Sequence, residues 1–289
     1  MADVEQQQNI YSNLILLNLK TNKEKIILRE KRHFEAPNWS RDNDYLIINS
    51  NGLLEKISLN GNFLETIDTH FAINCNNDHL LSFDGKTLAI SHNDTSVAEK
   101  DNSRIFILPA EGGIPQLITK NFPSYLHGIS PDGTTFIYTA KRNEKWNIYS
   151  INSSDKIEYQ LTDGALLDDG PEFSYDGNWI YFNSHRTNRM HLYRMKPDGS
   201  KQEQLTDDDY DNWFPHPSPD NKTIVYISYL KDQKGLHPFG QDVKLRQMDL
   251  ETKEIKDLTP VFYGGQGSIN VPSWSPDGEW IAYVKYEKI

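Results

Sequence analysis

The sequence predicts an all-β fold, a six-bladed β-propeller with four antiparallel strands per blade, and three observations lead to that prediction. A short turn of the form Ser-x-Asp-Gly or Ser-x-Asp-Asn occurs six times in 289 residues. Successive turn aspartates lie 42, 48, 44, 44 and 57 residues apart, which is the length of one propeller blade. An alternating apolar segment follows each turn. Repeated units of this length are typical of a ring of four-stranded sheets.

The composition of the turns explains their shape. In the commonest form a proline presets φ at the second position, the aspartate bonds to nearby backbone, and the final Gly or Asn tolerates positive φ. Each turn is therefore expected to join the first and second strands of a blade. The six turns occupy residues 40–43, 82–85, 130–133, 174–177, 218–221 and 275–278.

The segments after each turn predict the remaining strands. Alternating apolar residues predict second strands at 45–48, 87–90, 135–138, 179–182, 223–226 and 280–283. Third strands are expected at 104–108, 146–150 and 191–195, and fourth strands ending at 116–119, 160–162, 204–206 and 257–259. A third strand thus follows in most repeats, and one repeat corresponds to about one four-stranded sheet.

The last repeat is an exception, because the chain stops after only two of its strands. Residues 13–17 and 24–28 form two further strands that have no partners of their own. We expect these N-terminal strands to complete the C-terminal blade, which closes the ring and removes exposed sheet edges. The expected single domain, residues 1–289, then divides into blades at 34–70, 71–121, 122–164, 165–208, 209–262, and 263–289 together with 10–30.

Charge and composition exclude several classes of function. Thirty basic and 41 acidic residues give a net charge of −11, which argues against nucleic acid as a partner. No apolar run approaches the roughly 20 residues of a membrane span, and residues 1–6 lack the charged and apolar regions of a signal peptide. With Cys75 as the single cysteine, we expect a soluble cytoplasmic protein, or a periplasmic one if a leader has been removed.

Several segments resemble the TolB-type propeller repeat of bacterial proteins. They are Trp-Ser-Pro-Asp-Gly at 274–278, Ser-His-Arg-Thr at 184–187, Lys-Pro-Asp-Gly at 196–199 and Gln-Leu-Thr at 204–206. The first two repeats depart from the pattern, with Arg-Asp-Asn and Phe-Asp-Gly. Residues 212–217 and 264–272 are similar to those of stand-alone TolB-like proteins of unassigned role. The resemblance implies the fold, and it does not carry over the role of TolB in its periplasmic envelope complex.

The turns also locate a candidate site, because counting back from each turn serine superimposes the strands that line the central channel. The residue one position back is apolar and suits packing between blades, whereas the residue five positions back is polar or aromatic in every repeat. Such a ring suggests a ligand pocket, although it would also suit ordered water and strand caps. The candidate binding residues are Glu35, Asn77, Asp78, His79, Tyr125, His127, Asp168, Asp169, Glu172, Asn212, Trp213, His216, His237, Gln266 and Asn270.

Metal binding is a weaker expectation. His79, His127 and His216 come from different blades and could converge near the axis with Glu172 or Asp169, so a divalent metal ion there is one hypothesis. No short-range histidine spacing supports it. The acidic segment 207–211 does not match a calcium loop and is interpreted as a solvated turn. The long insertion around 237–242 is a candidate lid.

These observations favour a non-catalytic binding propeller that recognises a partner protein, a peptide or a small polar ligand at the channel mouth, with Trp213 and Tyr125 as stacking groups. The alternative is a metal-assisted hydrolase or lyase that acts on a carbohydrate-like substrate at the same place, similar in plan to propeller enzymes of oligosaccharide uronates. No Gly-x-Ser-x-Gly motif occurs, which argues against serine hydrolase chemistry. The sequence assigns no catalytic residue.

Overall fold

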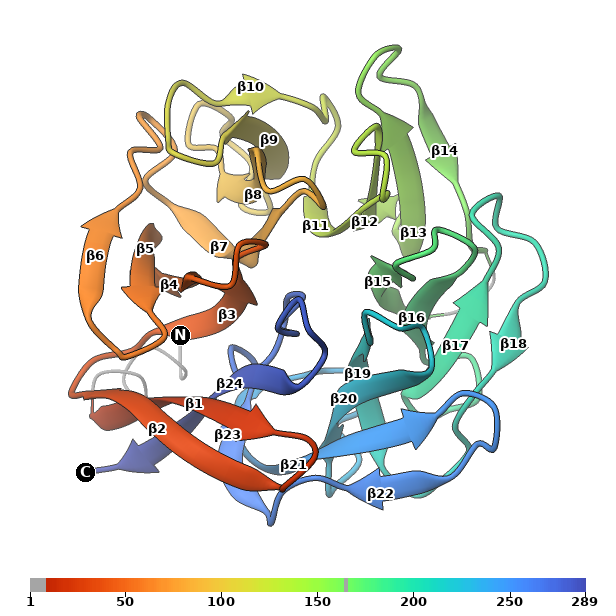
Figure 1. The fold of residues 1–289 in the computed structure, drawn as a ribbon. Coiled ribbons are helices and arrows are strands. Elements are labelled where there is room, and N and C mark those ends of the chain that lie inside the picture. Colours follow the sequence, from red (N-terminus) through yellow and green to blue (C-terminus); the bar gives the residue numbers. More distant parts are fainter. Residues whose placement is uncertain (1–8, 164–165) are drawn as a thin grey trace.

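The predicted fold class is confirmed by a computed structural model that describes residues 9–163 and 166–289. Among these residues there are strands and turns but no helices, and the sheets are arranged around a central axis as blades (Figure 1). The blade boundary expected at 164/165 and the N-terminal segment used to judge a signal peptide lie outside the described residues.

Five sheets run outward from the axis in chain order. The first contains β3 (Glu35–Trp39), β4 (Tyr45–Ser50), β5 (Leu53–Ser58) and β6 (Phe63–Thr66). The second contains β7 (Cys75–Leu81), β8 (Thr87–Asn93), β9 (Ser103–Pro109) and β10 (Gln116–Leu117). The third contains β11 (Ser124–Ile129), β12 (Thr135–Arg142), β13 (Lys145–Asn152) and β14 (Glu158–Gln160). The fourth contains β15 (Asp168–Phe173), β16 (Ile180–Ser184), β17 (His191–Met195) and β18 (Glu203–Gln204). The fifth contains β19 (Asp211–Pro217), β20 (Thr223–Tyr229), β21 (Phe239–Asp249) and β22 (Ile255–Asp257), and β23 (Phe262–Gly265) pairs with β21.

The sixth sheet joins the two ends of the chain, as the sequence predicts. Its strands are β2 (Lys23–Glu30), β1 (Ile10–Asn18) and β24 (Trp280–Lys288), and β1 pairs with β24 along its whole length. The inner of the two expected C-terminal strands is an irregular segment held by one bridge, between Trp274 and Ile281. Pro272 lacks an N–H to donate, which helps to explain why a regular ladder does not form there.

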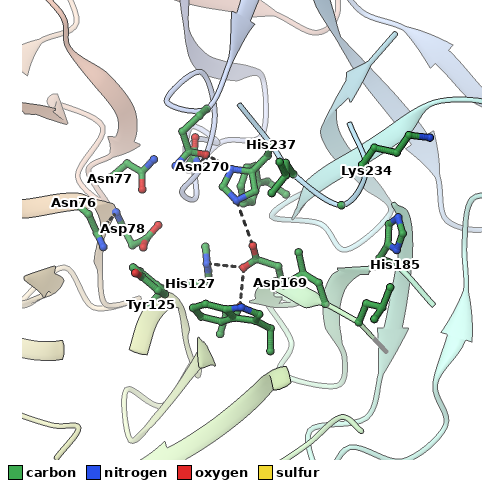
Figure 2. A pocket seen from close by; sticks show the side chains of 18 residues that line it. Asn76, Asn77, Asp78, Tyr125, His127, Asp169, His185, Lys234, His237 and Asn270 are labelled. Atoms are coloured by element: carbon green, nitrogen blue, oxygen red, sulfur yellow. Dashed lines mark hydrogen bonds and ion pairs between the residues drawn. The ribbon is translucent and has the colours of Figure 1, made fainter. Parts of the chain in front are cut away.

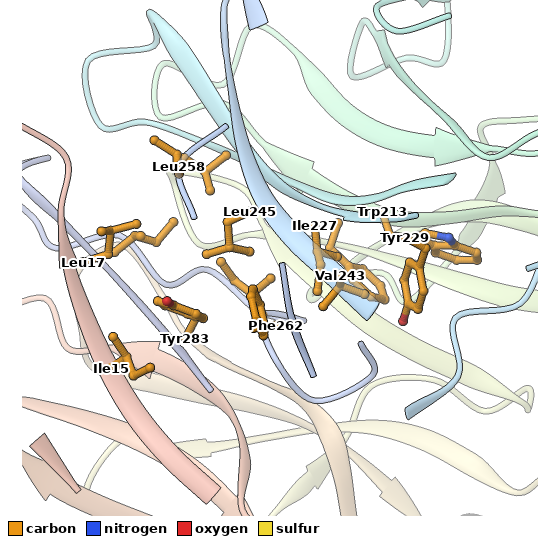
Figure 3. Close-up of a cluster of buried hydrophobic side chains, with 14 of the residues drawn as sticks. Ile15, Leu17, Trp213, Ile227, Tyr229, Val243, Leu245, Leu258, Phe262 and Tyr283 are labelled. Carbon is orange, nitrogen blue, oxygen red and sulfur yellow. The ribbon is translucent and has the colours of Figure 1, made fainter. Parts of the chain in front are cut away.

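Ring closure is stabilised by a cluster of buried side chains between the fifth and sixth sheets (Figure 3). Leu17 of β1 and Tyr283 of β24 pack in the same cluster as Leu245 of β21, and all three are fully buried. Burying an aliphatic or aromatic side chain of this size contributes about 1.5–3 kcal/mol. The N-terminal strands are therefore part of the core of the propeller.

The repeated turns have the same hydrogen bonds in all six blades. In each turn the serine hydroxyl donates to the aspartate Oδ1 over 2.5–2.7 Å. The same hydroxyl accepts the backbone N–H five residues further on, at 2.9–3.0 Å. The last turn residue, Gly or Asn, has φ between 59° and 74°. Serine and aspartate thus fix the entry into each second strand.

The opposite ends of the inner strands are irregular. All five of the inner strands β3, β7, β11, β15 and β19 carry a register shift against the next strand, a few residues before the turn. At three of these bulges a residue has positive φ: Ala36 (54°), Gly170 (60°) and Phe214 (54°). A bulge turns side chains away from the alternation of a regular strand. These bulges decide which residues face the axis.

Candidate functional site

A cavity of about 590 Å³ opens on the axis at the bulged ends of the inner strands (Figure 2). Its lining comes from several blades and from the loops above them. The residues are Asn76, Asn77, Asp78, Tyr125, His127, Thr139, Trp146, Leu166, Leu167, Asp169, His185, Phe214, Lys234, Gly235, Leu236, His237, Gln266 and Asn270. Eight of them belong to the set expected from the sequence: Asn77, Asp78, Tyr125, His127, Asp169, His237, Gln266 and Asn270.

The bulges explain why equivalent histidines lie in different places. In the third blade the register moves from Leu126 to Gly128, so that His127 is the bulged residue and faces the cavity. In the second blade the bulge covers residues 76–78, and His79 is back in register opposite Ile90. Its Nε2 lies 3.2 Å from the carbonyl oxygen of Ile47 in the neighbouring blade. The two histidines occupy the same position relative to their turns but have different surroundings.

Asp169 forms the centre of a charged network in the cavity. Its Oδ1 lies 3.2 Å from Nε2 of His127 and accepts a hydrogen bond from the Thr139 hydroxyl at 2.7 Å. Its Oδ2 lies 3.6 Å from Nε2 of His237, which comes from the loop before β21. The backbone N–H of Gly170 also donates to Asp169, at 2.7 Å. The network therefore links three parts of the chain across the axis.

These contacts hold Asp169 ionised. Burial alone would raise its pKa, but hydrogen bonding and attraction to His127, together with attraction to His237, lower the pKa of Asp169 to about 2. For His127, burial lowers the pKa, but the attraction of Asp78 and Asp169 outweighs it, so the pKa is raised overall. For His237, burial dominates and the pKa is lowered. An ionised Asp169 thus lies between His127, whose pKa is raised, and His237, whose pKa is lowered.

Asp78 is in a different situation, although it lies in the same cavity. Its side chain is buried, and Oδ1 of Asn76 accepts its backbone N–H at 2.9 Å. Among the described residues, no donor forms a hydrogen bond to the Asp78 carboxylate within the protein. Burial raises the pKa of Asp78 to about 7, attraction to His127 opposes this shift, and repulsion from Asp169 adds to it. Asp78 is thus a buried acceptor that faces the cavity.

Aromatic and apolar side chains form the remaining walls. The rings of Tyr125 and Trp146 lie 5.9 Å apart, and Phe214 stacks on the imidazole of His127 with centroids 6.0 Å apart. At the rim, Leu166 and Leu236 are 77% and 64% exposed. The cavity combines a polar floor with an apolar entrance, which is the usual composition of a small-molecule site.

A loop from the closing blade covers one side of the cavity. Nδ2 of Asn270 donates to Oε1 of Gln266 at 3.0 Å, and the same Gln266 oxygen contacts Nδ1 of His237. The N–H of Gly267 donates to Oδ1 of Asn270 at 2.7 Å. Gly267 has φ of 89°, and a Cβ there would lie 2.6 Å from Oε2 of Glu35. Only glycine lets the loop approach so closely.

Seven of the expected residues lie outside this cavity. Glu35 lies against Gly267 of the loop that covers the cavity. Burial and repulsion from Asp78 raise the pKa of Glu35 to about 8. Trp213 is fully buried behind His237, with ring centroids 4.5 Å apart, and belongs to the core between the blades. The other five, His79, Asp168, Glu172, Asn212 and His216, bond to groups within the protein.

The partners of those residues are specific. Asp168 accepts from Arg186 at 3.1 Å, and Asn212 bonds to Ser228, Asp208 and Thr206. His216 lies between Oε2 of Glu172, 2.6 Å from its Nδ1, and the carbonyl oxygen of Ile269, 2.8 Å from its Nε2. In each case the polar group joins one strand or blade to another. Their hydrogen bonds stabilise the ring.

Sequence reasoning missed some lining residues. Trp146 lies at the start of the third strand β13, and His185 lies in the loop after the second strand β16. Lys234 and Leu236 lie in the long fifth-blade insertion. Counting back along the inner strands cannot reach such positions. Phe214 was within reach, but its orientation depends on the bulge. The insertion itself was recognised as a candidate lid.

The other end of the channel is closed by Arg41. Its guanidinium lies over the rings of Phe83 and Tyr175, 4.7 and 5.7 Å from their centroids. It also donates to the Tyr175 hydroxyl at 3.3 Å and to the carbonyl of Ser82 at 3.3 Å. Arg41 thus joins the first, second and fourth blades. The space left there is about 10 Å³, too small for a ligand.

Within residues 9–163 and 166–289, no three His, Cys, Asp or Glu side chains are arranged to hold a metal ion. Of the histidines considered as ligands, His127 and His237 line the cavity, whereas His79 and His216 contact backbone carbonyls. The same residues include no helix long and apolar enough to cross a membrane.

Comparison with known proteins gives a family. The model of the TolB β-propeller domain matches residues 98–269. An uncharacterized protein of Agrobacterium fabrum is 46% identical over 276 residues, which are 95% of this chain and 92% of that protein. A solved structure from Agrobacterium tumefaciens, provisionally named as a TolB, is 44% identical with a TM-score of 0.91, and the match covers 97% of this chain and 99% of the other.

More distant structures share the fold alone. TolB from Acinetobacter baumannii is 16% identical with a TM-score of 0.66, over 97% of this chain and 67% of that one. An oligogalacturonate lyase in complex with manganese is 15% identical with a TM-score of 0.55, over 83% of this chain and 67% of that one. The shared architecture carries both non-enzymatic and enzymatic names, so function has to be argued from the cavity.

Proposed function

This chain belongs to the TolB β-propeller family, and from that premise we propose that it is a binding protein whose axial cavity takes up a small polar ligand. The observation that carries the proposal is the buried Asp78 carboxylate, which faces an axial cavity of ligand size and has no hydrogen-bond donor among the described residues. Asp78 lines the open cavity, so its carboxylate is available to a donor from a ligand. A ligand that supplies this donor forms a charge-assisted hydrogen bond, which is stronger than a bond between neutral groups.

The shape of the channel supports one-sided entry. The cavity is open at the bulged ends of the strands, and Arg41 with Phe83 and Tyr175 fills the opposite end. A volume of about 590 Å³ is within the usual range of small-molecule pockets. It also suits one terminal segment of a peptide or of a partner protein, which would enter past the exposed Leu166 and Leu236.

The alternative, a metal-assisted hydrolase or lyase, stays a prediction with less support. The cavity lining contains no serine or cysteine, and the hydroxyl of Thr139 is engaged by Asp169. His127 and Asp169 are an acid and base pair in principle, but each is neutralised by the other. A binding role requires no change in the pairing of His127 with Asp169. The identity of the ligand and the cytoplasmic location likewise stay predictions.

The proposal is tested by a thermal-shift screen of small polar compounds, followed by calorimetric titration of each compound that raises the melting temperature. Tyr125→Ala and Asn77→Ala change the cavity wall and should weaken binding at least tenfold. Tyr159→Ala, a change of an exposed tyrosine on β14, is the matched control and should bind like the wild type. If a ligand binds the wild type and the three variants with equal affinity, its binding site lies outside the axial cavity, and the proposal is wrong.

A further inference from the structure

We infer that the ligand of the axial cavity carries a protonated primary amino group, which binds to Asp78, and an apolar body that lies toward Tyr125 and Trp146. This inference rests on the proposed function and adds the chemical class of the ligand. The charges in the cavity, the acceptors near Asp78 and the aromatic wall support this assignment.

The charged groups of the cavity do not balance. Asp169 is paired with His127 at 3.2 Å, so these two charges neutralise each other. His237 is held near neutrality by burial, and its contact with Asp169 is longer, at 3.6 Å. Lys234 lies at the rim with its amino group on Asp232 and its side chain 81% exposed. His127 attracts both carboxylates, but it is in contact with Asp169, and the ionised form of Asp78 has no ion-pair partner among the described residues.

A buried unpaired charge is costly, so a cationic ligand group is favoured over a neutral or anionic one. The pKa of Asp78, about 7, agrees with this reading, because without a cation the carboxyl retains its proton into the neutral range. An ammonium group near the carboxylate would lower that pKa. Binding of the amine and ionisation of Asp78 are therefore linked.

The surroundings of Asp78 suit the three donors of an ammonium group. Asn77 and Asp78 lie next to each other on one side of the cavity, with Tyr125 close by (Figure 2). The Asn77 amide and the Tyr125 hydroxyl have no hydrogen-bond partner among the described residues. Both groups offer an oxygen acceptor beside the carboxylate. The site thus offers more than one acceptor to a single cationic head.

The aromatic wall favours an organic cation over a metal ion. The faces of Tyr125 and Trp146 attract a cation and also bury an apolar body, and the exposed Leu166 extends this surface outward. A hard metal ion such as Ca²⁺ prefers six to eight oxygen ligands. The lining residues include two carboxylates, Asp78 and Asp169, and Asp169 is paired with His127.

The test compares two probes of nearly equal shape, phenethylamine and 2-phenylethanol, by isothermal titration at pH 8. Here the alkylamine is protonated and Asp78 is ionised. Wild-type protein should bind the amine at least tenfold more tightly than the alcohol. Asp78→Asn should remove that preference by weakening the binding of the amine at least tenfold more than the binding of the alcohol, and Asp78→Ser should do the same if the asparagine variant folds poorly. Tyr159→Ala should keep the wild-type preference.

Equal affinity of the wild type for the two probes would overturn the amine assignment and leave the binding function intact. Failure of both probes to bind would also overturn it, and the proposed function would fall only if the compound screen likewise finds no ligand sensitive to Tyr125→Ala. Parallel titrations with Ca²⁺ and Mn²⁺ give a further check. Metal binding that Asp78→Asn abolishes would overturn the amine assignment in favour of a metal site.

Discussion

The two ends of the inner strands differ in how strictly they repeat. At the turn end, each blade has the same serine, the same aspartate and the same pair of hydrogen bonds. At the cavity end, every blade presents a different set of side chains around a bulge. The repeat therefore builds the ring, and the departures from the repeat build the site.

Asp78 and Asp169 illustrate the difference within the cavity itself. Asp169 accepts hydrogen bonds from Thr139 and Gly170 and contacts two imidazoles, so it resembles the satisfied turn residues. Asp78 lacks such partners among the described residues. One carboxylate thus organises the cavity, and the other remains available for a ligand.

The largest expected effect on stability is the difference between alanine variants of Trp213 and Tyr125. These two residues occupy the same position before their turns. Trp213→Ala removes a fully buried ring from the core and should lower the free energy of unfolding by about 3–5 kcal/mol. Tyr125→Ala removes a partly exposed cavity wall and should cost about 1 kcal/mol. Urea denaturation of both variants measures the difference. Similar losses would show that the two rings are not distinguished by burial.

A second comparison uses pH to distinguish the two aspartates. The raised pKa of Asp78, about 7, means that ionisation costs the folded state stability as the pH rises from about 4 to 7. Asp78→Asn should therefore be more stable than the wild type at pH 8, by roughly 4 kcal/mol, with the gain disappearing near pH 4. Denaturant unfolding at several pH values measures it.

Asp169→Asn should behave in the opposite way. Its pKa, lowered to about 2, adds stability that is present above the ordinary carboxyl pKa near 4 and is lost as the pH falls toward 2. The variant should lose roughly 2 kcal/mol at pH 7 and differ little from the wild type at pH 2. If both asparagine variants shift stability in the same direction at neutral pH, the assigned roles are wrong.

The smallest effect concerns the turns. Ser130→Ala removes a hydroxyl that donates to Asp132 and accepts the N–H of Thr135, and it should cost about 1 kcal/mol. Ser218→Ala should cost a similar amount, because its bonds to Asp220 and Thr223 have the same geometry. Thermal unfolding of the two variants checks this. If only one of the two variants loses stability, the two turns are not equivalent.

The sequence predicts the ring well because turn chemistry is local. Serine, aspartate and a residue tolerant of positive φ fix each turn without reference to the rest of the chain, and the spacing then sets the number of blades. Ring closure was also predicted, from the unpaired strands at both ends. The irregular segment before β24 was not predicted, because the spacing of the Trp-Ser-Pro-Asp-Gly turn indicated a regular inner strand there, whereas the segment forms one isolated bridge.

The site could be predicted only in part. A bulge shifts the register of a strand, so the residues before it can point to the other side of the sheet from the one that counting predicts. His79 and His127 are equivalent by counting, yet only His127 lines the cavity. Trp213 and Tyr125 are equivalent as well, yet only Tyr125 does. Bulge position depends on contacts between strands, and a single sequence gives no sign of it. Residues such as Lys234 and Leu236 lie in the fifth-blade insertion, outside the repeat altogether.

The most direct test of the central claim is a crystal structure of the protein grown with phenethylamine. We expect the compound in the axial cavity, with its amino group within hydrogen-bond distance of the Asp78 carboxylate and its ring against Tyr125 or Trp146. A probe bound on the outer strands, or a cavity that holds only water at saturating probe, would contradict the claim that this cavity is the binding site.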